Sequence, residues 1–329
     1  EQRARRHFDR DDRQLTSLPF HLHLETTTRC NAACITCVKG HCPYHAEDMR
    51  PHIFDRIERD LLPTAVQVNL TGSGEPLLCR EFDRFYDQAA RSGARVYLVT
   101  NTSLMTMQRI EKFARRPTIV IASIDGATAE TFEAIRRLTK FDRAVESLRR
   151  YKKMRDIYPE ARSSLAINFV AMQRNVEELP GVIDLAADLG AELVSVLDFA
   201  TADVPPEIAR EHLAYSPELA NRAFAEADER ARERGVADAV RFHLRDYREH
   251  TGRYDRIVSV GMFEHVGRAH HHAFFRRLRH LLAPDGVALV HSIGCFITDS
   301  GRNPWIQRYI FPGGRIPTLS EMGEAAGRA

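Results

Sequence analysis

The sequence lacks several features that would place it in a special class of protein. It has no run of about eighteen apolar residues, so no transmembrane helix is predicted. Six cysteines in 329 residues are too few for a disulfide framework. A formal net charge of +2 gives no general case for nucleic-acid binding. The N-terminal segment, residues 1–17, is charged rather than apolar, so it is not expected to be a secretory signal.

What remains is the composition of an ordinary globular protein, with 43% hydrophobic and 28% charged residues. The length favours one large α/β domain or two domains. The chain does not begin with Met, so we expect it to be a piece of a longer protein or a trimmed chain. Free thiols favour a reducing compartment, so the predicted location is the cytoplasm.

Three of the six cysteines stand together. Cys30, Cys34 and Cys37 have the spacing C-x3-C-x2-C within the stretch ETTTRCNAACITCVKGHC, directly after an apolar run. Thiolates are soft ligands that select iron–sulfur clusters, zinc or copper(I). Three thiolates on one short loop can bind three irons of a four-iron cluster and leave the fourth iron open. The stretch therefore predicts a metal centre.

A zinc site is an alternative, because His41, Cys42 and His45 lie close to these cysteines in the sequence. Zinc sites more often use two separated pairs of ligands, which this stretch does not show. On this reading the chain would be a zinc-binding or scaffold protein without catalytic activity.

Short β-branched runs alternate with amphipathic segments over the first two-thirds of the chain. The strand candidates are Phe20–Leu24, Val66–Leu70, Val96–Val99, Ile119–Ile124, Leu165–Val170 and Leu193–Leu197. The segment from Phe82 to Gly93 has the spacing of an amphipathic helix closed by a glycine cap. This alternation predicts βαβ units and a parallel sheet.

Active sites of parallel α/β folds form at the C-terminal ends of the strands. Polar or small residues at the ends of the predicted strands are therefore candidate site residues. They are Gly74, Glu75, Asn101, Ser123, Asp125 and Asn168. Small residues let the backbone approach a ligand, and Glu75 can accept hydrogen bonds from an ammonium group. Each motif alone is by default an ordinary turn or strand end.

The cysteine spacing, followed in order by these strand-end motifs, resembles the radical S-adenosylmethionine (radical SAM) family over about residues 18–236. The resemblance implies an open, partial (β/α)6 TIM-like barrel in which Cys30, Cys34 and Cys37 bind a [4Fe-4S] cluster. It implies that SAM binds the open iron and is cleaved reductively to a 5′-deoxyadenosyl radical, which abstracts hydrogen from a substrate.

The family also implies roles for the strand-end residues. Gly74 and Glu75 match the element that binds the amino group of SAM. Asn101, Ser123, Asp125 and Asn168 stand at the following strand ends, where Ser123 and Asp125 could meet the ribose or carboxylate of SAM. An electron donor such as flavodoxin or ferredoxin is expected as a partner. The sequence does not identify the substrate.

The sequence changes character at about residue 237. The runs Val240–Leu244, Ile257–Val260 and Val287–Val290 are predicted strands, with a helix over His271–Leu282. The segments YDRIVSVGMFEHVG, LLAPDGVALVHSIG and NPWIQRYIFPGG closely resemble the cyclopropane-fatty-acyl-phospholipid synthase family of SAM-dependent methyltransferases. The predicted domains are thus 18–236 and 237–329.

That family implies a catalytic base site that holds bicarbonate, matched here by Glu264 and His291. Asp246 lies where such folds contact adenine. The first strand and glycine-rich loop of a SAM-binding Rossmann fold are missing, so residues 237–329 are expected to form an incomplete, Rossmann-like methyltransferase fragment. The alternative functions are therefore a lipid methyltransferase of this family, and an inactive chimera.

A cluster of basic residues is predicted on the C-terminal helix. Arg276, Arg277 and Arg279 could form a surface for peripheral contact with acidic phospholipid. The commoner explanation for such residues is a solvated helix face.

Overall fold

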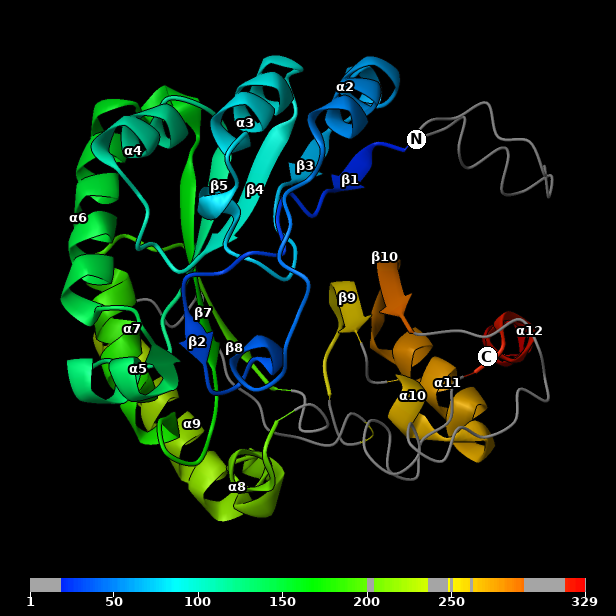
Figure 1. The fold of residues 1–329 in the computed structure, drawn as a ribbon. Helices are drawn as coiled ribbons and strands as arrows, with labels where there is room; N and C mark the ends of the chain where they lie inside the picture. The colour runs from blue at the N-terminus through cyan, green and yellow to red at the C-terminus, as the bar shows by residue number, and fades with distance from the viewer. Residues whose placement is uncertain are drawn as a thin grey trace. The chain divides into compact units, whose positions relative to one another are not determined.

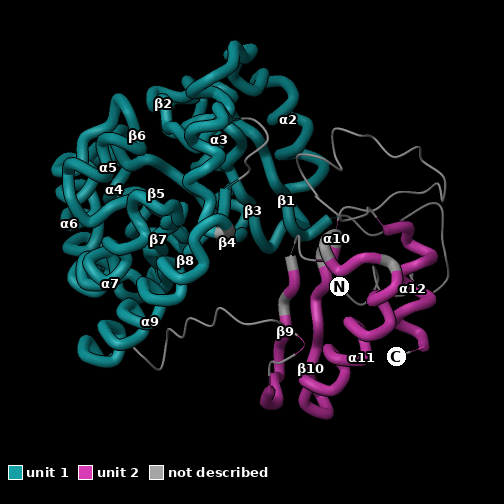
Figure 2. The backbone as a smooth tube through the Cα atoms, turned by 90° about the horizontal axis from the view of Figure 1, so that it is seen from below, with its two compact units in different colours: residues 1–199, 203–242 teal, residues 200–202, 243–329 magenta. Residues whose placement is uncertain are grey.

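The computed structural model describes residues 19–199, 204–235, 248, 251–260, 263–292 and 317–328. The chain divides into two compact units (Figure 2), of which the first comprises Glu1–Phe199 and Asp203–Phe242 and the second Ala200–Ala202 and His243–Ala329. The segment 1–17 and the predicted domain boundary after residue 236 lie outside the described residues. Both remain predictions.

The first unit is built on a six-stranded sheet with the order β1-β3-β4-β5-β7-β8, in which every pair is parallel. The strands are β1 (His21–His23), β3 (Gln67–Asn69), β4 (Arg95–Thr100), β5 (Thr118–Ser123), β7 (Ser164–Val170) and β8 (Leu193–Leu197). The strands succeed one another in chain order across the sheet. All six strand candidates are confirmed, as is the parallel sheet.

Helices follow the strands, and most of them lie along one side of the sheet (Figure 1). They are α2 (Pro51–Asp60), α3 (Phe82–Arg91), α4 (Met107–Ala114), α5 (Ala129–Ile135), α6 (Phe141–Ile157), α7 (Leu179–Asp188), α8 (Pro206–Ala209) and α9 (Pro217–Glu233). Helix α3 ends as predicted, with Gly93 at φ +85° just beyond it. Thr106 and Thr128 are the N-cap residues of α4 and α5, and their hydroxyls accept from backbone N–H groups of the first turn.

The core of the first unit lies between the sheet and these helices. Val68, Leu98 and Val120 come from successive strands and are fully buried. On the helix side, the rings of Phe54 and Phe85 stack with their centroids 4.1 Å apart. Burial of these side chains fixes the strands, and with them the C-terminal strand ends where the candidate site lies.

The second unit has a two-stranded parallel sheet of β9 (Tyr254–Val260) and β10 (Leu282–His291). Its helices are α10 (Phe263–Val266), α11 (His271–Leu281) and α12 (Leu319–Gly327). Phe263, Phe274 and Leu278 form its small core. Two predicted strands and the predicted helix are confirmed here, whereas the candidate strand Val240–Leu244 lies outside the described residues.

Within the described parts of both units, no helix has the length and apolar character needed to cross a membrane.

Replacement of Phe85 by Ala is expected to lower the free energy of unfolding by roughly 3–5 kcal/mol, because it removes a stacked ring and leaves a cavity. The control is Val66→Ala, since Val66 is 63% exposed and its truncation should change stability by less than about 0.5 kcal/mol. Urea unfolding followed by far-UV circular dichroism measures both. Equal effects of the two substitutions would contradict the assignment of Phe85 to the core.

Candidate functional site

The three clustered cysteines lie on the segment that joins β1 to α2, so they follow the C-terminal end of a strand as predicted. Cys34 closes the short strand β2 (Ala33–Cys34), and Cys37 precedes a turn of 3-10 helix, Val38–Gly40. The amide of Cys37 donates to the Cys34 carbonyl (3.1 Å), and that of Gly40 to the Cys37 carbonyl (2.8 Å). These turns bring all three thiols onto one compact loop, which we call the cysteine loop (residues 30–40).

The chemistry of the three thiols fits a cationic metal centre. All are free and half-buried. Burial raises the pKa of Cys30, and burial together with the neighbouring acidic groups raises that of Cys34 to about 11, although Arg136 opposes the shift. The nearby Cys37 also raises the pKa of both cysteines, because neighbouring thiolates repel one another. Three neighbouring thiolates therefore need a positive group between them, which iron would supply.

A four-iron cluster and a single metal ion need different arrangements of their ligands. Among the described side chains, no group of three or more His, Cys, Asp or Glu residues gathers closely enough to hold one metal ion. A four-iron cluster places its three thiolates on three separate irons, so its ligands need not converge on one point. The proposed zinc ligand His41 instead places its Nε2 atom 2.7 Å from the Ile35 carbonyl oxygen.

Glu75 connects the cysteine loop to two strand ends. Its carboxylate, 2% exposed, accepts from the Thr100 hydroxyl (2.7 Å) and from the amides of Asn101 (2.7 Å) and Leu77 (3.2 Å). Its own amide donates to the Arg29 carbonyl, immediately before Cys30 (2.8 Å). Burial raises the pKa of Glu75, and the three hydrogen bonds oppose this shift. The predicted residue thus lies next to the cysteine loop.

Asn101 forms a second connection to the cysteine loop. Its side-chain amide donates to the Asn31 side chain (2.9 Å), and Asn31 donates to the hydroxyl of Ser103 (2.8 Å). Asn31 follows Cys30 directly. Asn31 and Ser103 were not predicted from the sequence, since a lone amide on a loop is usually a turn residue.

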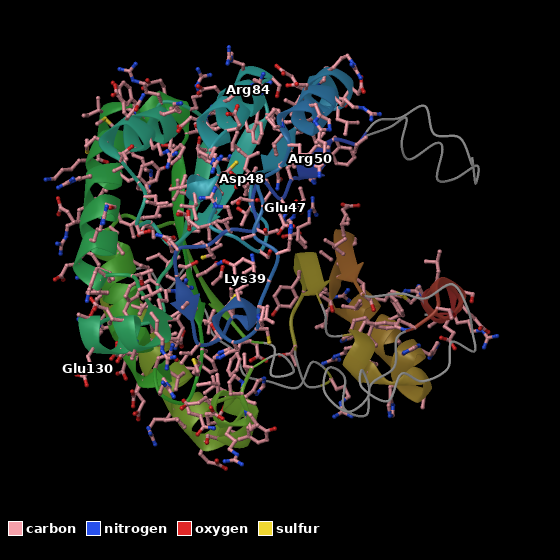
Figure 3. The ribbon with its side chains drawn as sticks, in the orientation of Figure 1. Lys39, Glu47, Asp48, Arg50, Arg84 and Glu130 are labelled. Atoms are coloured by element: carbon pink, nitrogen blue, oxygen red, sulfur yellow. The ribbon has the colours of Figure 1, made fainter. Side chains whose placement is uncertain are left out.

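Asp48 binds the segment of chain that precedes the cysteine loop. Its carboxylate accepts from the Thr27 hydroxyl (2.6 Å), the Arg29 guanidinium (3.1 Å) and the Arg80 amide (3.2 Å). Lys39, at the far end of the loop, donates to the Thr28 carbonyl and lies 4.6 Å from the centroid of the Tyr44 ring. Asp48 and Lys39 are both labelled in Figure 3.

Asp125 connects the loop to the ends of β5 and β7. This carboxylate is fully buried; its Oδ1 accepts from the Val170 amide (2.8 Å), and its Oδ2 lies 2.7 Å from Arg136 Nε. Arg136 also donates from Nη1 to the sulfur of Cys34 (3.8 Å). Arg136 was not predicted from the sequence; a basic residue following the Ser-Ile-Asp-Gly motif by one short helix was the available signal.

Ser123 and Asn168 are neighbours in the sheet. They are register partners on β5 and β7, and Asn168 is in turn the register partner of Ser195 on β8. Paired residues of parallel strands point to the same face. A row of three polar residues therefore crosses the sheet near its C-terminal edge, and Ser195 is a member that the sequence analysis did not select.

Gly74 is required for close packing within the protein. A Cβ at this position would lie 2.4 Å from the carbonyl oxygen of Thr27 and 2.5 Å from that of Arg29. The backbone that approaches Gly74 is thus the protein's own chain leading into the cysteine loop.

The predicted residues of the second unit are not brought together in what the structure describes. Glu264 belongs to α10 and His291 ends β10, but the positions of their side chains fall outside the described residues, as does the whole of Asp246. Their roles stay predictions.

Gly74→Ala is expected to destabilise the protein by roughly 1–3 kcal/mol and to lower its iron content after anaerobic reconstitution, because the added methyl group displaces the chain before Cys30. Gly93→Ala is the control, since a Cβ there meets nothing within 4 Å but φ is +85°. It should cost about 1 kcal/mol and leave the iron content unchanged. Unchanged iron content in Gly74→Ala would contradict the account.

Two family models match the chain. The model of the radical SAM superfamily matches residues 24–186, and that of mycolic acid cyclopropane synthetase matches residues 216–329. The mycofactocin maturase MftC of Mycobacterium tuberculosis is 30% identical over 180 residues, 53% of this chain and 44% of that protein. The cyclopropane-fatty-acyl-phospholipid synthase of Escherichia coli strain K12 is 41% identical over 102 residues, 31% of this chain and 27% of that protein. The chain thus spans less than half the length of these relatives.

Solved structures agree with the fold of the first unit. Streptococcus suis SuiB bound to S-adenosylmethionine aligns with a TM-score of 0.54 and 17% identity, covering 70% of this chain and 51% of SuiB. At this identity the likeness shows the fold alone. Together with the family models and the parallel sheet, it confirms the predicted α/β architecture. The chain therefore carries two regions that match different families: residues 24–186 match the radical SAM superfamily model, and residues 216–329 match the mycolic acid cyclopropane synthetase model.

Proposed function

We propose that this chain is a radical SAM enzyme, which cleaves S-adenosylmethionine reductively to a 5′-deoxyadenosyl radical that abstracts hydrogen from a substrate. The observation that carries the proposal is the arrangement of Cys30, Cys34 and Cys37. These free thiols lie on one loop that hydrogen bonds and an ion pair attach to the C-terminal strand ends of a radical SAM domain.

Cys30, Cys34 and Cys37 would hold the [4Fe-4S] cluster, which when bound supplies a single electron to SAM. The protein's task is to position the cofactors and exclude water. Ile35, between two of these cysteines, is 1% exposed and belongs to an apolar cluster with Ile135, Met172, Phe199 and Ile208. This cluster packs apolar side chains against one side of the cysteine loop, and in the proposal it would help to exclude water from the site.

Glu75 retains the capacity to bind the amino group of SAM. An ionised carboxylate offers about four acceptor sites, and Glu75 uses three of them within the protein. Gly74 keeps the backbone of this turn against the cysteine loop. In the proposal, Glu75 binds the ammonium group, Asn101 orients the loop, and Ser123 and Asn168 present polar groups to the carboxylate or ribose. Asp125 acts by holding Arg136.

A substrate and a reductant complete the proposal. We propose a peptide substrate, because the chain is similar to a protein named as a maturase and because a related structure shows SuiB bound to a precursor peptide. A one-electron donor of the flavodoxin or ferredoxin class would reduce the cluster. Free thiols on the cysteine loop favour a reducing compartment such as the cytoplasm.

A second candidate function is methyl transfer to lipid, favoured by the 41% identity of the C-terminal segment to a cyclopropane-fatty-acyl-phospholipid synthase. Glu264 and His291 would form its base site, with Asp246 near the adenine. Arg276 and Arg279 are exposed on α11 and would face acidic phospholipid. This reaction uses SAM as an electrophile and needs no reductant.

Formation of 5′-deoxyadenosine from SAM tests the first function. The reconstituted protein with dithionite is expected to produce it, and Cys34→Ala should produce no more than a sample without protein. Cys42→Ala is the matched control, because Cys42 is an exposed free thiol just beyond the same loop. It should behave as the wild type. Liquid chromatography with mass spectrometry quantifies the product.

One result would contradict the first function, and two others would support the alternatives. Iron-loaded wild-type protein that forms no 5′-deoxyadenosine argues against radical chemistry. Methylene transfer to phospholipid vesicles without dithionite supports the second function. Stoichiometric zinc that is lost in both Cys34→Ala and Cys42→Ala supports a zinc site instead.

A further inference from the structure

Arg136 is a buried cation placed between a cluster ligand and a carboxylate. Its side chain is 11% exposed, with Nη1 3.8 Å from the Cys34 sulfur and Nε 2.7 Å from Asp125 Oδ2. Burying a guanidinium is unfavourable unless anionic partners surround it. Asp125 is one such partner, and the Cys34 sulfur, once it binds iron as a thiolate, is a second.

The backbone fixes the distance between Arg136 and Cys34. The short strand β6 (Arg136–Arg137) pairs antiparallel with β2, and Cys34 is the register partner of Arg136. The next residues continue the contact, because the Ile35 amide donates to the Ile135 carbonyl (2.9 Å). The pairing of β2 with β6 therefore fixes the two backbones next to each other, so that the Arg136 side chain starts opposite Cys34.

Asp125 is equally well fixed. The Val170 amide donates to its Oδ1 (2.8 Å), and the side-chain amide of Asn175 donates to its backbone carbonyl (3.0 Å). Asn175 is itself fully buried. The row Cys34, Arg136 and Asp125 thus has both ends anchored, one in the cysteine loop and the other at the end of β7.

A positive charge and a hydrogen bond at a cluster sulfur stabilise the more negative, reduced state of an iron–sulfur cluster. We propose that Arg136 is a positioning residue that raises the reduction potential of the cluster bound through Cys34, and that Asp125 limits this effect by partly neutralising the guanidinium. This inference rests on the proposed function. It concerns the reduction potential of the cluster, which governs the first electron transfer of that function.

The step concerned is a transfer of one electron from a low-potential donor protein to the oxidised cluster. No bond forms or breaks in it, and Arg136 keeps its protons throughout, because a guanidinium is not deprotonated in proteins. Arg136 acts through its charge and its N–H group, both of which are present before the electron arrives.

Arg137 provides a matched control. It is the next residue of the same strand, has the same charge and is exposed. Its register partner is Ala33, which has no ligand atom. A charge at this place is screened by water and should have little influence on the cluster.

The test is the midpoint potential of the reconstituted cluster, measured without SAM by a redox titration followed by electron paramagnetic resonance. Arg136→Gln should lower the potential, and Asp125→Asn should raise it, because the guanidinium then lacks its neutralising partner. Arg136→Lys keeps the charge but loses the planar fork, so its potential should lie between those of wild type and Arg136→Gln. Arg137→Gln should match the wild type.

The opposite shifts in potential expected for Arg136→Gln and Asp125→Asn separate this role from a structural one. A structural role would lower the amount of cluster without changing the potential of the cluster that remains. Equal potentials in wild type and the Arg136 variants would overturn the inference, as would a lower potential in Asp125→Asn. If Arg136→Gln holds no cluster, Arg136→Lys and Asp125→Asn still decide. Wild-type protein that cleaves SAM while these potentials stay equal refutes the inference alone; wild-type protein that takes up no cluster refutes the proposed function as well.

Discussion

The first unit depends on how two buried carboxylates attach an irregular loop to the end of a parallel sheet. A carboxylate removed from water is unfavourable unless donors or a cation surround it. Glu75 meets this requirement with a hydroxyl from the last residue of β4 and amides from the loops after β3 and β4. Asp125 meets it with Arg136 and the Val170 amide. The Glu75 amide contacts Arg29 directly before the cysteine loop, and the Arg136 guanidinium contacts Cys34 within it, so both carboxylate sites help to position this loop.

The same arrangement explains why small residues stand where they do. Gly74 lets the turn after β3 pack against the chain that leads into the cysteine loop, and a Cβ on Gly40 would lie 2.5 Å from the Cys34 carbonyl oxygen. The loop is therefore held by packing as well as by hydrogen bonds. This rigidity suits an enzyme that must hold a cofactor and a reactive intermediate in fixed geometry, since the protein contributes position while the cofactor contributes the chemistry.

The strands and the cysteine cluster could be predicted from the sequence, because β-branched runs between amphipathic segments and a fixed cysteine spacing are local signals. Contacts between residues that lie far apart in the sequence could not be predicted. Arg136 lies 102 residues after Cys34 and reaches it through a two-residue strand pair with no hydrophobic periodicity. Asn31 was identified only through its contacts with the loop after β4, and Ser195 only through its partner in the sheet. In the second unit, two strands and a helix followed the predicted pattern, while the roles of Asp246, Glu264 and His291 stay predictions.

We propose above all that the cysteine loop holds a four-iron cluster with an iron open to SAM. Electron paramagnetic resonance of the reduced, anaerobically reconstituted protein, recorded with and without SAM, tests it most directly. The account predicts a four-iron signal that shifts when SAM is added and disappears in Cys34→Ala. A signal that SAM leaves unchanged, or bound zinc in place of iron, would contradict it.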